Sequence, residues 1–157
     1  MPIDYSRYPA NWAEISRRIR FERAQGRCEQ CGVEHGAYIL RSTVDPARYL
    51  RYDVESDRYY FPDGSLLRVH LSEFPEEYDR DKFTRVVLTV HHIGIDKPDG
   101  SPGDIHDKTD CRDENLLALC QRCHLIADMP THVQNARATR LHKKAAAIEA
   151  AGQRKLL

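Results

Sequence analysis

The sequence contains no apolar run that approaches the ~20 residues needed for a membrane-spanning helix. Its first ten residues, 1–10, also lack the apolar stretch of a secretory signal peptide. Glycine and proline are not enriched, with eight of each, and we find no repeat or low-complexity segment. These absences argue against membrane, secreted, repeat and disordered proteins, so we expect a globular protein of the cytoplasm.

The chain also lacks net charge, because 24 basic residues balance 24 acidic residues. The charges are nevertheless clustered: residues 7–27 carry a net of +4, residues 132–157 a net of +5, and residues 45–81 a net of −5. Clustered basic charge is what a phosphate backbone requires, although most charged helices are simply solvated. Charge alone therefore does not indicate nucleic-acid binding.

Five cysteines are present, and in a reducing compartment they indicate metal binding before disulfides. Four of them form two Cys-x-x-Cys motifs, Cys28/Cys31 and Cys120/Cys123. Four thiolates from two tight turns make a closed tetrahedral site that favours zinc. The 88 residues between the motifs exceed a compact finger, so the zinc would join distant parts of one domain. Two unrelated pairs or a redox motif are the alternatives, and Cys111 is left over as a free or packed thiol.

Hydrophobic spacing predicts a helix over residues 11–25, with Asn11 as its cap and with Trp12, Ile15 and Ile19 on its apolar face. A last helix is predicted over residues 131–150. A short helix is expected to open at Asp113 or Glu114, just before the second cysteine motif.

Short strands are expected over residues 37–72, including a hairpin whose arms are 58–61 and 66–71. Residues 85–91 form the clearest predicted strand, because valine and leucine crowd together there. The long loop 94–110 follows, and a loop of that length in a compact domain is usually functional or disordered.

His91 and His92 end the clearest strand, where neighbouring side chains point to opposite faces. One imidazole can therefore face a metal while the other faces a substrate, although two adjacent histidines can also be structural. Two later residues favour the functional interpretation: Asn115, and His124, which the second cysteine motif would hold rigidly as a metal ligand needs. Asp128 lies one turn beyond His124 if that segment is helical.

Residues 88–93 (LTVHHI) and 114–124 (ENLLALCQRCH) resemble the HNH endonuclease family, which has a ββα-metal core. The leading segment, residues 8–32, is similar to the zinc-bearing phage and bacterial members of that family. The resemblance covers residues 8–32 and 86–129, somewhat under half of the chain.

The resemblance implies a role for each motif residue. His92 corresponds to the general base, and His91 to a ligand of the catalytic metal. Asn115 corresponds to the residue that orients the base and its loop, and His124 to a second metal ligand. Asp128 stands where some members, including the colicin-type nucleases, place a further metal-binding histidine.

These roles suit the hydrolysis of a phosphodiester bond. A neutral histidine can take the proton of an attacking water, and one divalent metal can stabilise the charge on the leaving 3′-oxygen. Mg²⁺ or Mn²⁺ suits the phosphate, and the imidazoles also admit Zn²⁺, Ni²⁺ or Co²⁺. Basic residues of the two terminal helices are candidates for phosphate contacts with DNA: Arg17, Arg20, Arg137, Arg140 and Lys144.

We therefore predict an α+β fold in one nuclease domain, residues 1–157: a ββα-metal core braced by a four-cysteine zinc site, with flanking helices and a β-rich insertion. Its parts are the N-terminal helix and first cysteine motif (8–32), the insertion (37–82), the core (85–129) and the last helix (131–150). The predicted function is nicking or cleavage of DNA. The alternatives are a catalytically inactive zinc-dependent nucleic-acid-binding module and a toxin-type nuclease with an immunity partner. The sequence leaves open whether the insertion, residues 37–82, covers the cleft or binds a protein partner.

Overall fold

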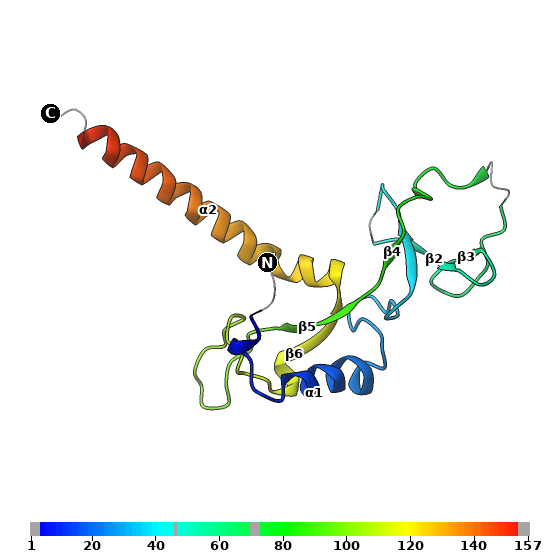
Figure 1. Ribbon diagram of the computed structural model, residues 1–157, viewed down its shortest axis with the longest axis horizontal. Helices are drawn as coiled ribbons and strands as arrows, with labels where there is room; N and C mark the ends of the chain where they lie inside the picture. Colours follow the sequence, from blue (N-terminus) through cyan, green and yellow to red (C-terminus); the bar gives the residue numbers. More distant parts are fainter. Residues whose placement is uncertain (1–3, 46, 70–72, 154–157) are drawn as a thin grey trace. The chain divides into compact units, whose positions relative to one another are not determined.

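The computed structural model describes residues 4–45, 47–69 and 73–153, and the chain divides into two compact units, Met1–Gln121 and Arg122–Leu157 (Figure 1). It mixes helices with two antiparallel sheets, which agrees with the predicted α+β class. The elements in chain order are η1 (Tyr5–Arg7), α1 (Trp12–Arg17), η2 (Arg18–Arg23), β1 (Tyr38–Arg41), β2 (Tyr49–Asp53), β3 (Arg58–Tyr60), β4 (Thr84–Arg85), β5 (Leu88–His92), η4 (Asp113–Asn115), β6 (Leu116–Cys120) and α2 (Gln121–Gln153).

The predicted first helix exists as α1, which continues into η2 as a wider π-helical turn. Asn11 makes no side-chain hydrogen bond to the helix, so the prediction that it caps α1 is wrong. Its ψ of 16° departs from the extended backbone of a capping residue, and only its carbonyl accepts from the helix. The apolar face is as predicted: Ile19 is fully buried against Leu116 and Ala118.

Four antiparallel strands form the first sheet, in the order β3-β2-β1-β4. Three of them lie within the predicted β-rich segment 37–82, and buried Leu40, Leu50 and Tyr78 form the core beside them. The hairpin after β3 is shorter than predicted, because its second arm is reduced to an isolated bridge at Leu66. Residues 70–71 of that predicted arm lie outside the described residues.

β5 and β6 form a separate antiparallel pair, in which Leu88 lies opposite Cys120 and His92 opposite Leu116 (Figure 1). The prediction of a short helix here is wrong, because only η4 is helical and residues 116–120 are a strand. The backbone of β6 forms hydrogen bonds along both of its edges. β5 pairs with one edge, and at the other edge Glu29 exchanges two hydrogen bonds with Ala118.

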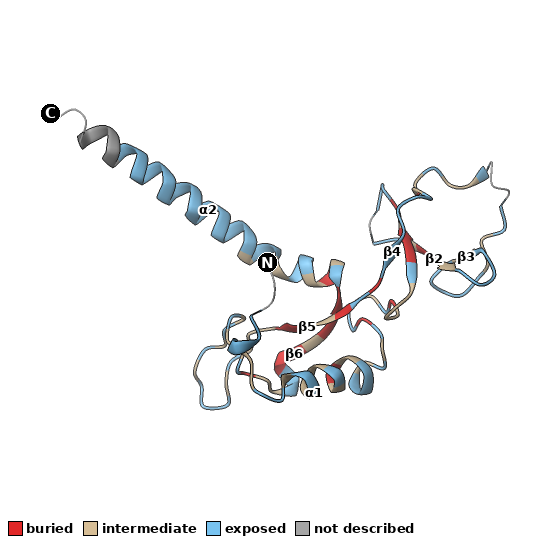
Figure 2. Ribbon diagram, in the orientation of Figure 1, coloured by how far each residue is buried: buried red, intermediate tan, exposed pale blue. Residues whose placement is uncertain are grey.

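The second unit is the helix α2 after its first residue. This helix begins at Gln121, well before the predicted start at residue 131, and it passes through Pro130. Proline usually interrupts a helix interior, which is why the sequence favoured a later start. Every residue from 132 to 148 is exposed (Figure 2). No helix among the described residues is both long and apolar enough to cross a membrane.

Candidate metal centres

The two cysteine motifs come together as predicted. Cys31 Sγ lies 3.7 Å from Cys120 Sγ, and the backbone N–H of Cys120 donates to Cys28 Sγ at 3.3 Å. With Cys123 they form a group of four thiols whose sulfur atoms all lie within 4.8 Å of one another. Four sulfur donors at this spacing suit a tetrahedral metal site such as zinc.

Local backbone geometry directs these sulfurs to one point. The first motif is a tight turn in which Gly32 donates to the carbonyl of Cys28, and Gly32 has a φ of +73° that favours glycine. Cys120 is the last residue of β6. Hydrogen bonds from Cys120 and Cys31 lower the pKa of Cys28, while contacts with Cys120 and Cys28 raise the pKa of Cys31. The thiols therefore share protons, which a bound metal would displace. Three of the four cysteines are buried, as in a closed structural site.

The histidine pair ends β5, opposite Leu117 and Leu116. Both imidazoles are buried, with exposed fractions of 8% for His91 and 2% for His92. The Trp12 ring stacks on the His92 ring at a centroid distance of 5.5 Å. The His92 side chain therefore faces the N-terminal segment of the first unit.

His92 is held in its neutral form. Burial, followed by the nearby charges of Lys108 and His91, lowers the pKa of His92 to about 4. Its Nε2 is buried, and no described residue forms a hydrogen bond with it. A buried acceptor without a partner is costly, and such atoms mark places where a water or ligand can be bound.

Asn115 joins the two ends of the loop that follows His92. Its side-chain oxygen accepts from the N–H groups of Gly94 (2.8 Å) and Ile95 (3.1 Å), and its amide donates to the carbonyl of Asp110 (3.0 Å). The side chain is fully buried, so these three bonds have no competition from solvent. Asn115 therefore holds the beginning and the end of this loop together.

Like Asn115, Arg112 bonds to both ends of this loop, and sequence reasoning did not identify it. Its guanidinium forms a bidentate pair with Asp110, at 2.8 Å to each oxygen, and donates to the carbonyls of Ile95 and Asp96. No sequence signal distinguishes Arg112 from the other arginines, because the carbonyls of Ile95 and Asp96 come near it only when the loop folds.

Replacing Asn115 by alanine is expected to lower the free energy of unfolding by about 3 kcal/mol, because it leaves buried polar groups of the loop without partners. Chemical denaturation followed by circular dichroism measures the change. Asn135→Ala, an exposed position on α2, is the control and should change stability by less than about 0.5 kcal/mol. Equal loss in both variants would show that the Asn115 bonds do not stabilise the loop.

No family model, curated protein or solved structure matches this chain. The resemblance to the HNH family is therefore a prediction from the sequence motifs.

A second group of possible metal ligands comprises His91, His124 and Asp128, each of which offers one ligand atom. Within α2, His124 Nε2 lies 3.4 Å from a carboxylate oxygen of Asp128, one turn further on. The segment is thus helical, as the predicted pairing of these two residues required. Nitrogen and oxygen donors distinguish this group from the all-sulfur group.

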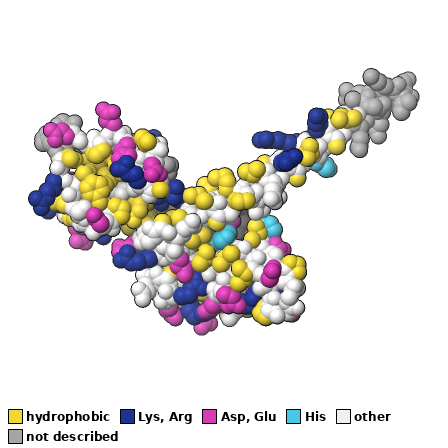
Figure 3. Space-filling view, turned by 180° about the vertical axis from the view of Figure 1, so that it is seen from behind, with side chains coloured by type: hydrophobic (Ala, Val, Ile, Leu, Met, Phe, Trp, Pro, Cys, Tyr) yellow, Lys and Arg dark blue, Asp and Glu magenta, His cyan; other side chains and the backbone are white. Residues whose placement is uncertain are grey.

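The basic residues predicted to contact phosphates differ in whether their side chains are already bonded within the protein. Arg20 donates to the carbonyls of Ser16 and Leu88, so its guanidinium is engaged within the fold, and Arg17 pairs with Glu22 at 2.6 Å on the surface. On α2, basic side chains lie exposed along one stretch of the helix (Figure 3). Spacings of three and four residues place three of them on one face: Arg137, Arg140 and Lys144.

Proposed function

We propose that this protein is a metal-dependent endonuclease of the HNH type that nicks or cleaves DNA. One observation carries the proposal: β5, β6 and α2 follow one another as strand, strand and helix, with each motif residue at a distinct place along them. His91 and His92 end the first strand, Asn115 directly precedes the second, and His124 lies in the first turns of the helix.

In this proposal His92 is the general base. Its lowered pKa keeps the imidazole neutral at neutral pH. In the tautomer that is protonated at Nδ1, Nε2, which has no partner among the described residues, can accept a proton from water. Trp12 covers the ring, so the N-terminal segment has to shift for water and phosphate to reach Nε2. Asn115 keeps the loop after His92 in one conformation.

The proposed ligands of the catalytic metal are His91, His124 and Asp128. Three protein ligands leave coordination positions for phosphate and water, and two imidazoles with one carboxylate accept Mg²⁺ or Mn²⁺ as well as Zn²⁺, Ni²⁺ or Co²⁺. The bound metal would stabilise negative charge on the scissile phosphate and the leaving 3′-oxygen. The proposed zinc site would hold the start of α2, because Cys123 directly precedes His124.

Relaxation of supercoiled plasmid by the purified protein tests the proposal. We expect nicked or linear product when Mg²⁺ or Mn²⁺ is added and none in the metal-free buffer. Parallel reactions with single-stranded DNA and RNA define the substrate. Absence of cleavage under every divalent ion, in protein that retains its zinc, would refute the nuclease proposal.

The exposed basic face of α2 is proposed to contact DNA phosphates. Replacing Arg137, Arg140 and Lys144 together by glutamine is expected to weaken duplex binding. The slope of log affinity against log salt should fall by about 3, because roughly one counterion is released per phosphate contact. Fluorescence anisotropy across salt concentrations, without divalent ions, measures the slope. A triple variant with three exposed arginines of the first unit replaced by glutamine is the control and should keep the slope: Arg48, Arg58 and Arg68.

His92 is buried and its ring is covered by Trp12, which would keep substrate from the imidazole. This burial favours a second candidate function, a zinc-dependent nucleic-acid-binding module without catalysis. Metal analysis separates the two functions. The binding module would hold one tightly bound metal per chain and gain no activity from other ions, whereas the nuclease should bind a second, exchangeable ion.

A further inference from the structure

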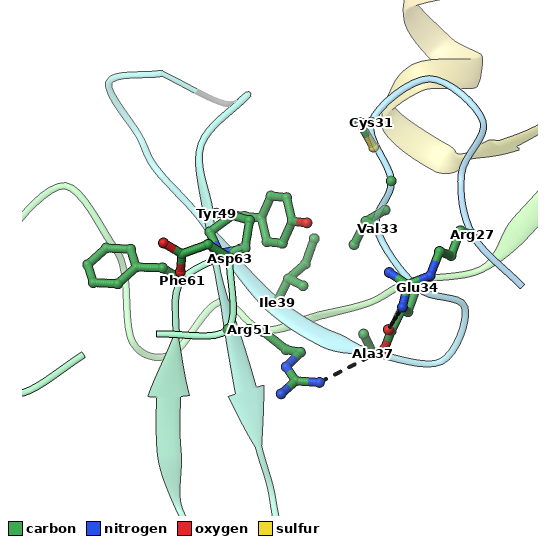
Figure 4. A pocket seen from close by; sticks show the side chains of 13 residues that line it. Arg27, Cys31, Val33, Glu34, Ala37, Ile39, Tyr49, Arg51, Phe61 and Asp63 are labelled. Atoms are coloured by element: carbon green, nitrogen blue, oxygen red, sulfur yellow. Dashed lines mark hydrogen bonds and ion pairs between the residues drawn. The ribbon is translucent and has the colours of Figure 1, made fainter. Parts of the chain in front are cut away.

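A pocket of about 430 Å³ lies between the first cysteine motif and the four-stranded sheet (Figure 4). A volume of this size is typical of sites that enclose a small organic ligand. Its described lining residues include no histidine, so it is separate from the histidine group proposed for catalysis. Among its lining residues, the sequence motifs assigned a role at a site only to Cys31.

One wall of the pocket carries an arginine whose hydrogen-bond donors are unused. Arg51 lies on β2, and its guanidinium is held over the ring of Tyr60 at 5.3 Å from the ring centroid. Its nearest acid, Glu34, is 3.9 Å away and pairs more closely with Arg27, at 2.5 Å. In the described part of the chain the Arg51 side chain donates no hydrogen bond, so its planar set of N–H groups remains available for an anion.

Aromatic rings line the same space. Tyr49 projects from β2 toward the first cysteine motif, and Phe61 lies at the hairpin after β3 (Figure 4). Tyr49 is half-buried, with the guanidinium carbon of Arg41 5.9 Å from its ring centroid, while 36% of Phe61 is exposed. No described residue bonds to the Tyr49 hydroxyl, and its pKa is raised by burial, so it remains a neutral donor. Rings in such positions can stack on any nucleobase.

The charged side chains of the pocket differ between its two ends. Asp63 lies beside Phe61 at the hairpin, away from Arg27 (Figure 4). Hydrogen bonds from Ser65 lower the pKa of Asp63 and keep it ionised. A carboxylate repels phosphate but accepts from the amino groups of a base. Glu34 also lies in the pocket, but Arg27 and Arg51 flank it and leave a net positive charge at their end. An anionic ligand would therefore place its phosphate at the arginine end.

We propose that this pocket binds one unstacked nucleotide, with its base against Tyr49 and Phe61 and its phosphate at Arg27 and Arg51. A free nucleotide and a nucleotide within a single strand share this chemistry. The proposal goes beyond nuclease activity, because it requires no reaction at the pocket and holds if the protein cleaves nothing.

Binding is tested on the zinc-loaded full chain without added divalent ions, so that cleavage does not occur. The probes are deoxycytidine 5′-monophosphate, whose base carries an amino group, and a fluorescent single-stranded oligodeoxycytidylate. Phe61→Ala removes a stacking surface at an exposed position and should weaken binding about 10-fold. Arg51→Met keeps the aliphatic stem, removes the charge and should weaken binding by a similar factor.

Matched controls lie outside the pocket. Tyr38→Ala removes an exposed ring of the same sheet, and Arg58→Met removes an exposed charge on β3, so both should bind within about 2-fold of the unchanged protein. Zinc content verifies that every variant is folded. If the pocket variants weaken binding of the mononucleotide, the ligand is a free nucleotide. If they weaken binding of the oligonucleotide and the mononucleotide does not bind, the ligand is a nucleic-acid strand. Equal binding by pocket and control variants, or no binding of either probe, would overturn the proposal.

Discussion

Cys120→Ser is expected to abolish zinc binding and to unfold the protein. Cys120 is fully buried, and its sulfur and backbone N–H contact both cysteines of the first motif. Structural zinc contributes about 10–16 kcal/mol to the folding of zinc-finger peptides at pH 7. This contribution is as large as the entire ~5–15 kcal/mol stability of a typical domain, so the remaining contacts cannot sustain the fold.

Elemental analysis should find one tightly bound zinc per unchanged chain and none in Cys120→Ser, whose circular dichroism should lose its thermal transition. Cys111→Ser is the matched control. Cys111 lies outside the group of four, and its thiol makes one long hydrogen bond, 3.5 Å, to the carbonyl of Lys108. This variant should keep both its zinc and its melting transition. A folded Cys120→Ser protein without zinc would show that the metal is not structural.

The second large effect is expected at His92. His92→Ala should reduce the rate of DNA cleavage by about 10²–10⁴-fold, the usual contribution of a general base. The loss should appear in kcat rather than in DNA affinity, because a base acts in the transition state. Initial rates of plasmid nicking in saturating Mn²⁺, together with duplex binding without the ion, separate the two quantities.

A buried imidazole also fills space, so alanine leaves a cavity beneath Trp12. His92→Gln retains most of the volume without a comparable base, and it should lose activity while melting near the temperature of the unchanged protein. His142→Gln, an exposed change on α2, is the control and should cut at the normal rate. Normal cutting by His92→Gln would exclude His92 as the base.

The largest error of prediction lies just before the second cysteine motif. Leu116, Leu117 and Leu119 have spacings that suit a helix as well as a strand. Residues 116–120 form a strand because β5 and Glu29 supply hydrogen-bond partners for their backbone. Both β5 and Glu29 are far from this segment in the sequence. Local propensity cannot include partners brought in by the rest of the fold.

The burial of His92 was likewise invisible in the sequence. Trp12 was assigned to the apolar face of the first helix, and nothing in its spacing indicates that its ring stacks on an imidazole 80 positions later. Arg112 and the nucleotide-sized pocket depend in the same way on neighbours that only folding brings together.

The sequence by itself determined the α+β class, the grouping of Cys28, Cys31, Cys120 and Cys123, and the one-turn spacing of the last histidine and acid. Each follows from short-range spacing combined with a chemical preference, such as that of thiolates for one metal. Only the tertiary structure decided which segments became strands, how deeply the histidine pair is buried, and which arginines are engaged by the fold. Those properties depend on long-range hydrogen bonds and on exclusion of water, which arise once distant segments pack together.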